Sequence, residues 1–99
     1  MNIIRTKEGT ALTVALEGRM DAISAPQLEK ELEAEMENIT DLTLDLEKLV
    51  YTSSAGLRVL LSAQKAMNRK GRMVIRNVRP EIMEIFDMVG FTDLLNIEE

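Results

Sequence analysis

The sequence predicts an α/β fold in which a mixed sheet carries its helices mainly on one face. Alternating apolar segments typical of strands and capped helical segments follow one another in the order β-β-α-β-α-β-α-β. The first two strands predict an antiparallel hairpin, and each later helix connects two strands, which predicts parallel crossovers. Residues 42–47 alternate strictly, with leucines on one side only. Since a sheet covered on both faces favours continuous apolar strands, this alternation predicts cover on one face.

The length of 99 residues fits one domain, and we expect residues 1–99 to form it because no linker, repeat or low-complexity tract interrupts the pattern. The chain has no cysteine, which suits a reducing compartment. No segment approaches the roughly 18 apolar residues of a membrane span. The first ten residues, MNIIRTKEGT, lack the pattern of a secretion signal. We therefore expect a soluble, cytoplasmic protein without a membrane partner.

The first three elements follow from local patterns. Two runs rich in β-branched residues, 2–6 and 10–18, predict the hairpin, and Gly9 supplies the positive φ of a tight turn. A helix follows within 19–39, with Ser24 as its cap and Gln27 three residues later, as in a capping box. Its apolar face is formed by Leu28, Leu32 and Met36. Its other face carries Glu29, Glu33 and Glu37, which we interpret as a solvated face rather than an acidic patch for a partner.

The remaining elements alternate strand and helix. Strand 41–49 precedes a helix expected at 54–70, which ends at Gly71. The inward side of that helix is predicted to hold Leu57, Leu60, Leu61 and Met67. After strand 72–78, Pro80 opens a third helix, and Gly90 in the left-handed conformation ends it. The expected core face of the third helix is Ile82, Ile85, Phe86 and Val89. Residues 93–97 predict a last short strand.

The composition disfavours several kinds of function. The chain has no histidine, the commonest general base and metal ligand, so we expect no catalytic site, no metal site and no cofactor. The formal net charge of -5 argues against direct nucleic-acid binding. Every charged side chain between 58 and 79 is nevertheless basic: Arg58, Lys65, Arg69, Lys70, Arg72, Arg76 and Arg79. The sequence leaves the role of this stretch open.

The junction LEKLVYTSSAGLRVLL places Ser53 and Ser54 at the carboxyl edge of the sheet, where parallel sheets meet ligands and partners. Three readings compete for these serines. One of them caps the helix, an interaction of about 1 kcal/mol. A nucleophile is disfavoured because no glycine stands two residues before either serine and no histidine can accept the proton. Phosphorylation suits the site, since a phosphate on the first turn meets free N–H groups and the positive end of the helix dipole.

These segments resemble the STAS-domain anti-sigma factor antagonists of bacteria, also called anti-anti-sigma factors. VALEGRMDAISAPQLEKEL is similar to the second strand, loop and first helix of that family, LTLDLEKLVYTSSAGLRVLL to its signature, and IFDMVGFTDLL to its C-terminal helix and turn. The signature reads apolar residue, any residue, Asp, Ser, small residue, Gly, Leu. Aligned on Gly56, it places the phosphate acceptor on Ser54 and replaces the usual aspartate by Ser53. The resemblance therefore implies a STAS-like sheet and phosphorylation of Ser54, with Ser53 as the alternative acceptor.

The resemblance also implies a partner-binding surface. Asp21 matches an aspartate that the family places near the acceptor; a carboxylate that only stabilises the helix dipole is the equal alternative. Met20 and Ile23 flank it and would suit a partner if exposed, or would enter the core. The whole expected surface consists of Met20, Asp21, Ser53, Ser54, Ala55, Gly56, Leu57 and Arg58.

The implied function is regulatory and not enzymatic. The unphosphorylated protein would bind an anti-sigma factor that is also a serine kinase, and would thereby free a sigma factor. Phosphorylation at Ser54 would end this binding, and a serine phosphatase would restore it, with ATP and magnesium belonging to the kinase. The alternative is a STAS regulatory or scaffolding module of another signalling or transport complex, without a sigma factor.

Overall fold

The computed structural model describes residues 1–98 and contains a four-stranded mixed sheet in the order β1-β2-β3-β4. The strands are β1 (Asn2–Glu8), β2 (Ala11–Met20), β3 (Asp41–Thr52) and β4 (Arg72–Arg76). The helices are α1 (Ala25–Glu35), α2 (Ser54–Asn68) and α3 (Pro80–Met88), with short 3-10 turns η1 (Met36–Asn38) and η2 (Phe91–Asp93). β1 and β2 are antiparallel, whereas β2 with β3 and β3 with β4 are parallel. The predicted hairpin followed by parallel crossovers is confirmed.

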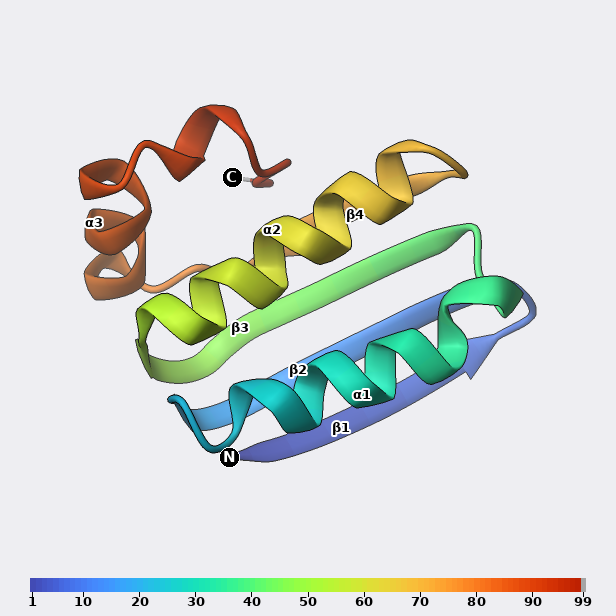
Figure 1. Ribbon diagram of the computed structural model, residues 1–99, viewed down its shortest axis with the longest axis horizontal. Helices are drawn as coiled ribbons and strands as arrows, with labels where there is room; N and C mark the ends of the chain where they lie inside the picture. The colour runs from blue at the N-terminus through green and yellow to red at the C-terminus, as the bar shows by residue number, and fades with distance from the viewer. Residues whose placement is uncertain (99) are drawn as a thin grey trace.

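The helices cover one face of the sheet. α1 and α2 lie side by side across it, and α3 packs against β3 (Figure 1). The leucines of β3 that point to the helices, Leu42, Leu44 and Leu46, are at most 1% exposed. They join Leu28 of α1 and Leu60 of α2 in one continuous core. The residues that alternate with these leucines, Thr43 and Asp45, are only half-buried, so the one-sided cover predicted from the alternation is confirmed.

The hairpin turn is tighter than expected. β1 continues through Glu8, which pairs with Ala11, so the turn consists of Gly9 and Thr10 alone. Gly9 has φ +60°, the left-handed conformation predicted for it. The side chains of Arg5 and Lys7 point to the helical face and form ion pairs with α1, through Glu31 at 3.4 Å and Glu35 at 3.5 Å.

The last predicted strand is reduced to a single bridge between Ile75 and Ile97. The N–H groups of Leu94 and Leu95 both donate to the carbonyl of Phe91, which closes η2 and removes these residues from the sheet. Only the end of the segment reaches β4, where Ile75 donates to Asn96 and Glu98 donates to Ile75. A local turn therefore replaces most of the strand expected at 93–97.

Two further differences concern helix ends. α2 ends at Asn68, two residues before the predicted end at Lys70, because the N–H groups of Lys70 and Gly71 both turn back to the carbonyl of Met67. Gly90 adopts φ +75° as predicted, but Val89 before it is 48% exposed. Val89 was expected in the core and is instead at the surface, because α3 has already ended at Met88.

Candidate functional site

The site is built where β2 and β3 end next to each other. The last paired residues are Arg19 with Tyr51 and Met20 with Thr52. Beyond them, the N–H of Ser53 donates to the carbonyl of Met20 at 2.8 Å. The loop that leads into α1 and the loop that leads into α2 are therefore held together by backbone contacts at the carboxyl edge of the sheet.

The two serines have different roles in this loop. Ser53 is the cap of α2: its backbone is extended, with φ -90° and ψ 175°, and its Oγ accepts a hydrogen bond from the N–H of Gly56 at 3.3 Å. Its carbonyl accepts the first helical bond, from Leu57 at 3.0 Å. Ser54 is the first helical residue and is exposed, and its hydroxyl has no hydrogen-bond partner among residues 1–98. The capping reading therefore applies to Ser53, and the hydroxyl of Ser54 remains accessible.

Asp21 organises the loop before α1. Its Oδ1 accepts hydrogen bonds from the N–H groups of Ile23 and Ser24, both at 2.9 Å. The Oγ of Ser24 in turn accepts from the N–H of Asp21 at 2.9 Å. The backbone N–H of Ser24, followed by that of Ile23 and by the Ser24 hydroxyl, lowers the pKa of the Asp21 carboxyl below its ordinary value. The carboxylate is thus a fixed negative charge in this loop.

The predicted capping box at Ser24 is wrong. Ser24 has helical angles, φ -83° and ψ -27°, and its side chain forms no cap bond with α1. The helical turn begins earlier, because the N–H of Ala25 already donates to the carbonyl of Asp21 at 2.9 Å. Asp21 therefore fills the role expected of Ser24, three residues upstream, because its carboxylate accepts from the N–H groups of Ile23 and Ser24.

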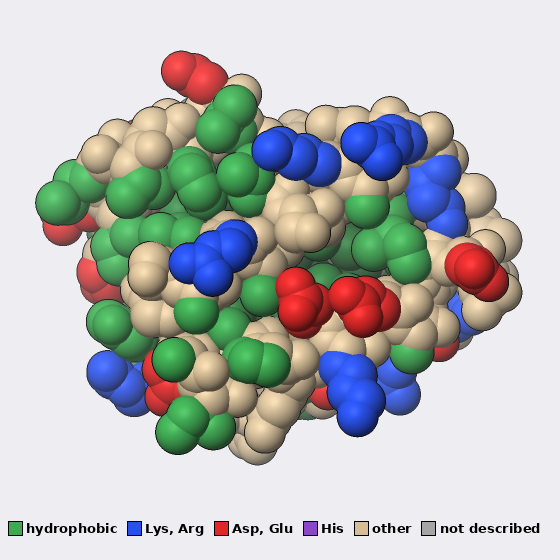
Figure 2. Space-filling view, viewed as in Figure 1, with side chains coloured by type: hydrophobic (Ala, Val, Ile, Leu, Met, Phe, Trp, Pro, Cys, Tyr) green, Lys and Arg blue, Asp and Glu red, His purple; other side chains and the backbone are tan. Residues whose placement is uncertain are grey.

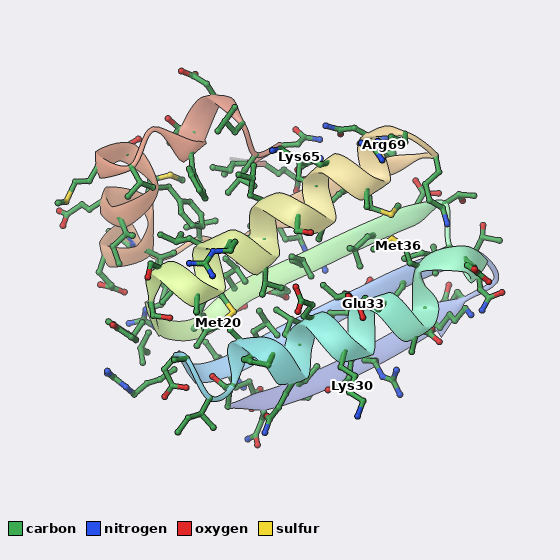
Figure 3. The ribbon with its side chains drawn as sticks, in the orientation of Figure 1. Met20, Lys30, Glu33, Met36, Lys65 and Arg69 are labelled. Atoms are coloured by element: carbon green, nitrogen blue, oxygen red, sulfur yellow. The ribbon has the colours of Figure 1, made fainter. Side chains whose placement is uncertain are left out.

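Several residues expected at the partner surface instead support it from below. Met20 is 0% exposed and Leu57 is 6% exposed, and Met20 lies under the amino end of α2 (Figure 3). Gly56 is also buried, and a Cβ on it would come within 2.5 Å of the Thr52 Oγ1 and 2.8 Å of two Met20 side-chain atoms. Of the two alternatives for Met20, exposure to a partner is wrong and burial in the core is correct, since its side chain is inaccessible to solvent.

The accessible part of the site mixes polar and apolar side chains. Ser54 and Arg58 are exposed one turn apart on α2, and Ala55 is half-buried between them. Ile23 in the neighbouring loop is 79% exposed and Val50 near the end of β3 is 47% exposed. Exposed apolar side chains near the ends of the two strands are typical of a protein contact surface rather than of a small-molecule pocket.

A pair that the sequence analysis missed lies next to these loops. The guanidinium of Arg19 sits over the ring of Tyr51, 4.2 Å from its centroid. Both residues are at the last paired positions of β2 and β3. The signal was present in the sequence, since both side chains stand just before the loops that carry Asp21 and Ser53.

The described residues show neither a metal centre nor a membrane-spanning helix. Among residues 1–98, no group of three or more His, Cys, Asp or Glu side chains is placed to hold a metal ion. No helix in this part of the chain has both the length and the apolar character needed to cross a bilayer.

Comparison with known proteins identifies the family of this chain. The family model of the STAS domain matches residues 2–99. BtrV of Bordetella bronchiseptica, named as an anti-sigma factor antagonist, is 33% identical over 98% of this chain and 85% of its own length. The anti-sigma-B factor antagonist of Staphylococcus aureus is 29% identical over 100% of this chain and 94% of its own.

Solved structures agree on the fold. The anti-sigma factor antagonist SpoIIAA in its unphosphorylated form superposes with a TM-score of 0.85 at 16% identity, covering 99% of this chain and 89% of SpoIIAA. The phosphorylated form of the Bacillus protein gives a TM-score of 0.79 at 16% identity, covering 99% and 92%. With the strand order, the two tied loops and the TSSAGL segment at the start of α2, these matches lead to one conclusion: the chain belongs to the STAS domain family, among the anti-sigma factor antagonists.

Proposed function

We propose that this protein is a phosphorylation-controlled anti-sigma factor antagonist, with Ser54 as the phosphate acceptor. In its unphosphorylated form it binds a cognate anti-sigma factor that is also a serine kinase, and so frees a sigma factor in the cytoplasm. Phosphorylation of Ser54 ends the binding, and a serine phosphatase restores it. The chain, as a single domain, performs no catalysis itself. The observation that carries the proposal is the exposed Ser54 hydroxyl at the first position of α2, beside a cap already provided by Ser53.

The position favours a phosphate in the free protein. The first N–H groups of a helix have no acceptor within the helix, and the dipole places positive charge at this end. A phosphoserine carries about -1.5 to -2 charges at pH 7 and accepts hydrogen bonds through three oxygens. On Ser54 it would also stand one turn from the Arg58 guanidinium, at the i, i+4 spacing at which opposite charges attract. The fold therefore accommodates the modification.

The same charge opposes burial against a partner. A partner that covers Ser54 together with Ile23 would have to remove water from a dianion. Asp21, already ionised in the adjacent loop, adds negative charge on the same edge. We expect phosphorylation to weaken the complex at least about 100-fold, which corresponds to about 2.7 kcal/mol.

The test uses a kinase-type anti-sigma factor from the same genome. Calorimetry measures its affinity for the wild-type protein, for Ser54→Ala and for Ser54→Asp, and mass spectrometry locates phosphate after incubation with ATP and Mg²⁺. We expect wild type and Ser54→Ala to bind alike, phosphate to appear on Ser54, and Ser54→Asp to remain folded but bind poorly.

Ser53→Ala is the matched control, because it removes the neighbouring hydroxyl and the cap without removing the proposed acceptor. It should still be phosphorylated on Ser54. Phosphate on Ser53 alone would assign the switch to the other serine. A protein that binds no such anti-sigma factor and acquires no phosphate would support the scaffolding module and contradict this proposal.

A further inference from the structure

A groove runs between α1 and α2 on the helical face and reaches the serine loop only at its amino end, at Ala55 and Arg58. Its hollow of ≈ 220 Å³ is floored by Leu32 of α1, Met36 of η1, and Val59 and Ala63 of α2, with Glu29 and Glu33 on the α1 side. A smaller hollow of ≈ 110 Å³ extends it towards the amino ends of both helices, next to Ala25 and Ala55. The two share Glu29 and Val59, so the groove is continuous along both helices.

The groove exists because α2 presents small side chains to α1. Ser62, Ala63 and Ala66 line it, where longer side chains would fill the space between the two helices. Its floor is apolar, and Met36 is only half-buried there. α1 extends for 11 residues, so at 1.5 Å per residue the groove offers a length of about 16 Å, or three turns of a partner helix.

The carboxylates on the α1 side of the groove form no ion pairs among residues 1–98. α1 carries two rows of glutamates, of which Glu31 and Glu35 pair with Arg5 and Lys7 of β1. The other row, Glu29 and Glu33, is exposed at the groove and has no ion-pair partner among residues 1–98. Figure 3 shows Glu33 on the side of α1 that faces α2, with Lys30 pointing away from the groove.

The outer surface of α2 carries the opposite charge. Arg58, Lys65 and Arg69, which we call the basic row, are exposed at seven-residue and four-residue spacings and so lie along one side of the helix. None of the three has an ion-pair partner among residues 1–98. In Figure 2 basic side chains line the α2 side of this face and two acidic side chains lie below them, with hydrophobic surface between.

We propose that the α1–α2 groove is a docking site for an amphipathic helix of a protein partner. The apolar stripe of that helix lies on the groove floor, its basic flank faces Glu29 and Glu33, and its acidic flank faces the basic row. An apolar floor with unpaired charges of opposite sign on its two sides matches the binding mode in which one helix lies in a groove. This inference goes beyond the proposed function and does not require phosphorylation of Ser54.

The two charged sides also define a direction for the bound helix. Turning an amphipathic helix end for end exchanges its flanks, so only one direction places basic groups over α1 and acidic groups over α2. Complementary charges select register and orientation more than they add affinity. Exchanging the charges of the groove should therefore reverse the bound helix without abolishing binding.

The probe is a stapled 16-residue peptide with a leucine stripe, lysines on one flank, glutamates on the other and a nitroxide at its amino end. Binding to the full chain is followed by NMR of methyl groups. We expect chemical-shift changes at Met36, Val59, Ala63 and Ala66. Glu29→Lys with Glu33→Lys should weaken binding about tenfold, while the matched control Lys30→Glu, on the side of α1 away from the groove, should leave it unchanged.

The decisive variant combines Glu29→Lys, Glu33→Lys, Lys65→Glu and Arg69→Glu. It should regain the lost affinity, and the nitroxide should broaden methyl signals at the opposite end of the groove. The proposal is overturned if millimolar peptide leaves the groove methyls unshifted, if a peptide with glutamates on both flanks binds equally well, or if the quadruple variant fails to bind. If the chemical shifts of the groove methyl groups change with protein concentration in the absence of peptide, the groove binds a second copy of the chain. That result would also overturn the proposal.

Discussion

At the residue scale, the carboxyl edge of the sheet is organised by a few side chains that satisfy backbone groups. Asp21 accepts from two backbone N–H groups, Ser53 accepts from Gly56, and the N–H of Ser53 reaches Met20. Because these bonds hold both loops in place, Ser54 is presented on a fixed framework. Its own hydroxyl forms no part of that framework among the described residues.

The first prediction separates the two serines by stability. Ser53→Ala removes the cap of α2 and should lower the free energy of unfolding by about 1 kcal/mol. Ser54→Ala should change the free energy of unfolding by less than about 0.5 kcal/mol, because the hydroxyl that it removes is exposed and makes no hydrogen bond among residues 1–98. Urea unfolding followed by circular dichroism measures both. A larger loss for Ser54→Ala than for Ser53→Ala would contradict this assignment of the cap.

The second prediction concerns the pH dependence of Asp21. Its pKa is lowered in the folded state, so its hydrogen bonds contribute stability that is present above the unfolded pKa of about 3.9 and is lost as the pH falls through the lowered folded value. NMR titration of the Asp21 carboxyl carbon should therefore give a midpoint below the ordinary one.

Asp21→Asn is the control for this titration, because its side-chain oxygen still accepts hydrogen bonds but cannot be protonated in this range. The amide signals of Ile23 and Ser24 should lose their acid transition in this variant. A wild-type midpoint at or above the ordinary value would show that the two N–H bonds are not kept in solution.

The sequence indicated which residues lie at this edge of the sheet, but not which of their side chains are buried and which cap a helix. Gly56 and Leu57 aligned the signature, and the alignment placed the expected acceptor on Ser54, whose side chain is exposed. The sequence left the burial of Met20 open as one of two alternatives, because it depends on how the end of β2 meets the first turn of α2. The cap at Asp21 was missed for a related reason: Ser24 matched a capping pattern, but backbone angles decide which residue begins the helix.

At the element scale, close approach between α2 and the ends of β2 and β3 determines the geometry of the site. Gly56 allows this approach, since Thr52 and Met20 occupy the space that a side chain would need. Strand and helix segments with strong periodicity were predicted correctly. The segment 93–97 was not, because pairing in the sheet competed with the local turn η2, and a pattern of five residues cannot decide between them.

The third prediction tests this contact between elements. Gly56→Ala should improve the helix propensity of α2 by up to about 1 kcal/mol, but the new Cβ meets two buried side chains at 2.5 and 2.8 Å, which costs about 1–3 kcal/mol. We expect net destabilisation in thermal unfolding. Combining it with Thr52→Ala, which removes the nearest atom, should cost less than the sum of the two single changes. Strict additivity would argue against a contact through Gly56.

At the scale of the whole molecule, one hydrophobic core connects every helix with the sheet. The core extends from Leu12 and Leu28 to Ile82 and Leu95. The radius of gyration of 12.2 Å agrees with about 12.6 Å for a compact chain of this length. Fold class was the most predictable feature. It follows from the order of the elements and from strands that are apolar on one face only, and neither of these depends on the exact residue at which a helix ends.

The fourth prediction is that the chain unfolds as one cooperative unit. Tyr51, the only tyrosine of a chain without tryptophan, lies at the carboxyl end of β3 and reports on the site by fluorescence. Far-ultraviolet circular dichroism reports on all helices and strands together. The two urea transitions should have the same midpoint, as two-state unfolding requires. An earlier fluorescence transition would show that the carboxyl end of the sheet opens independently of the core.

The cap at Ser53 has a consequence for the amount of protein in a cell. Proteases and chaperones act on the unfolded fraction, so a stability change of 1–2 kcal/mol alters abundance several-fold. Because the cap that holds α2 does not involve Ser54, a phosphate on Ser54 would leave the cap intact and would not raise the unfolded fraction. The modified molecule would then be degraded no faster than the unmodified one. Under the proposed function, the modified form would be removed by the phosphatase and not by selective degradation.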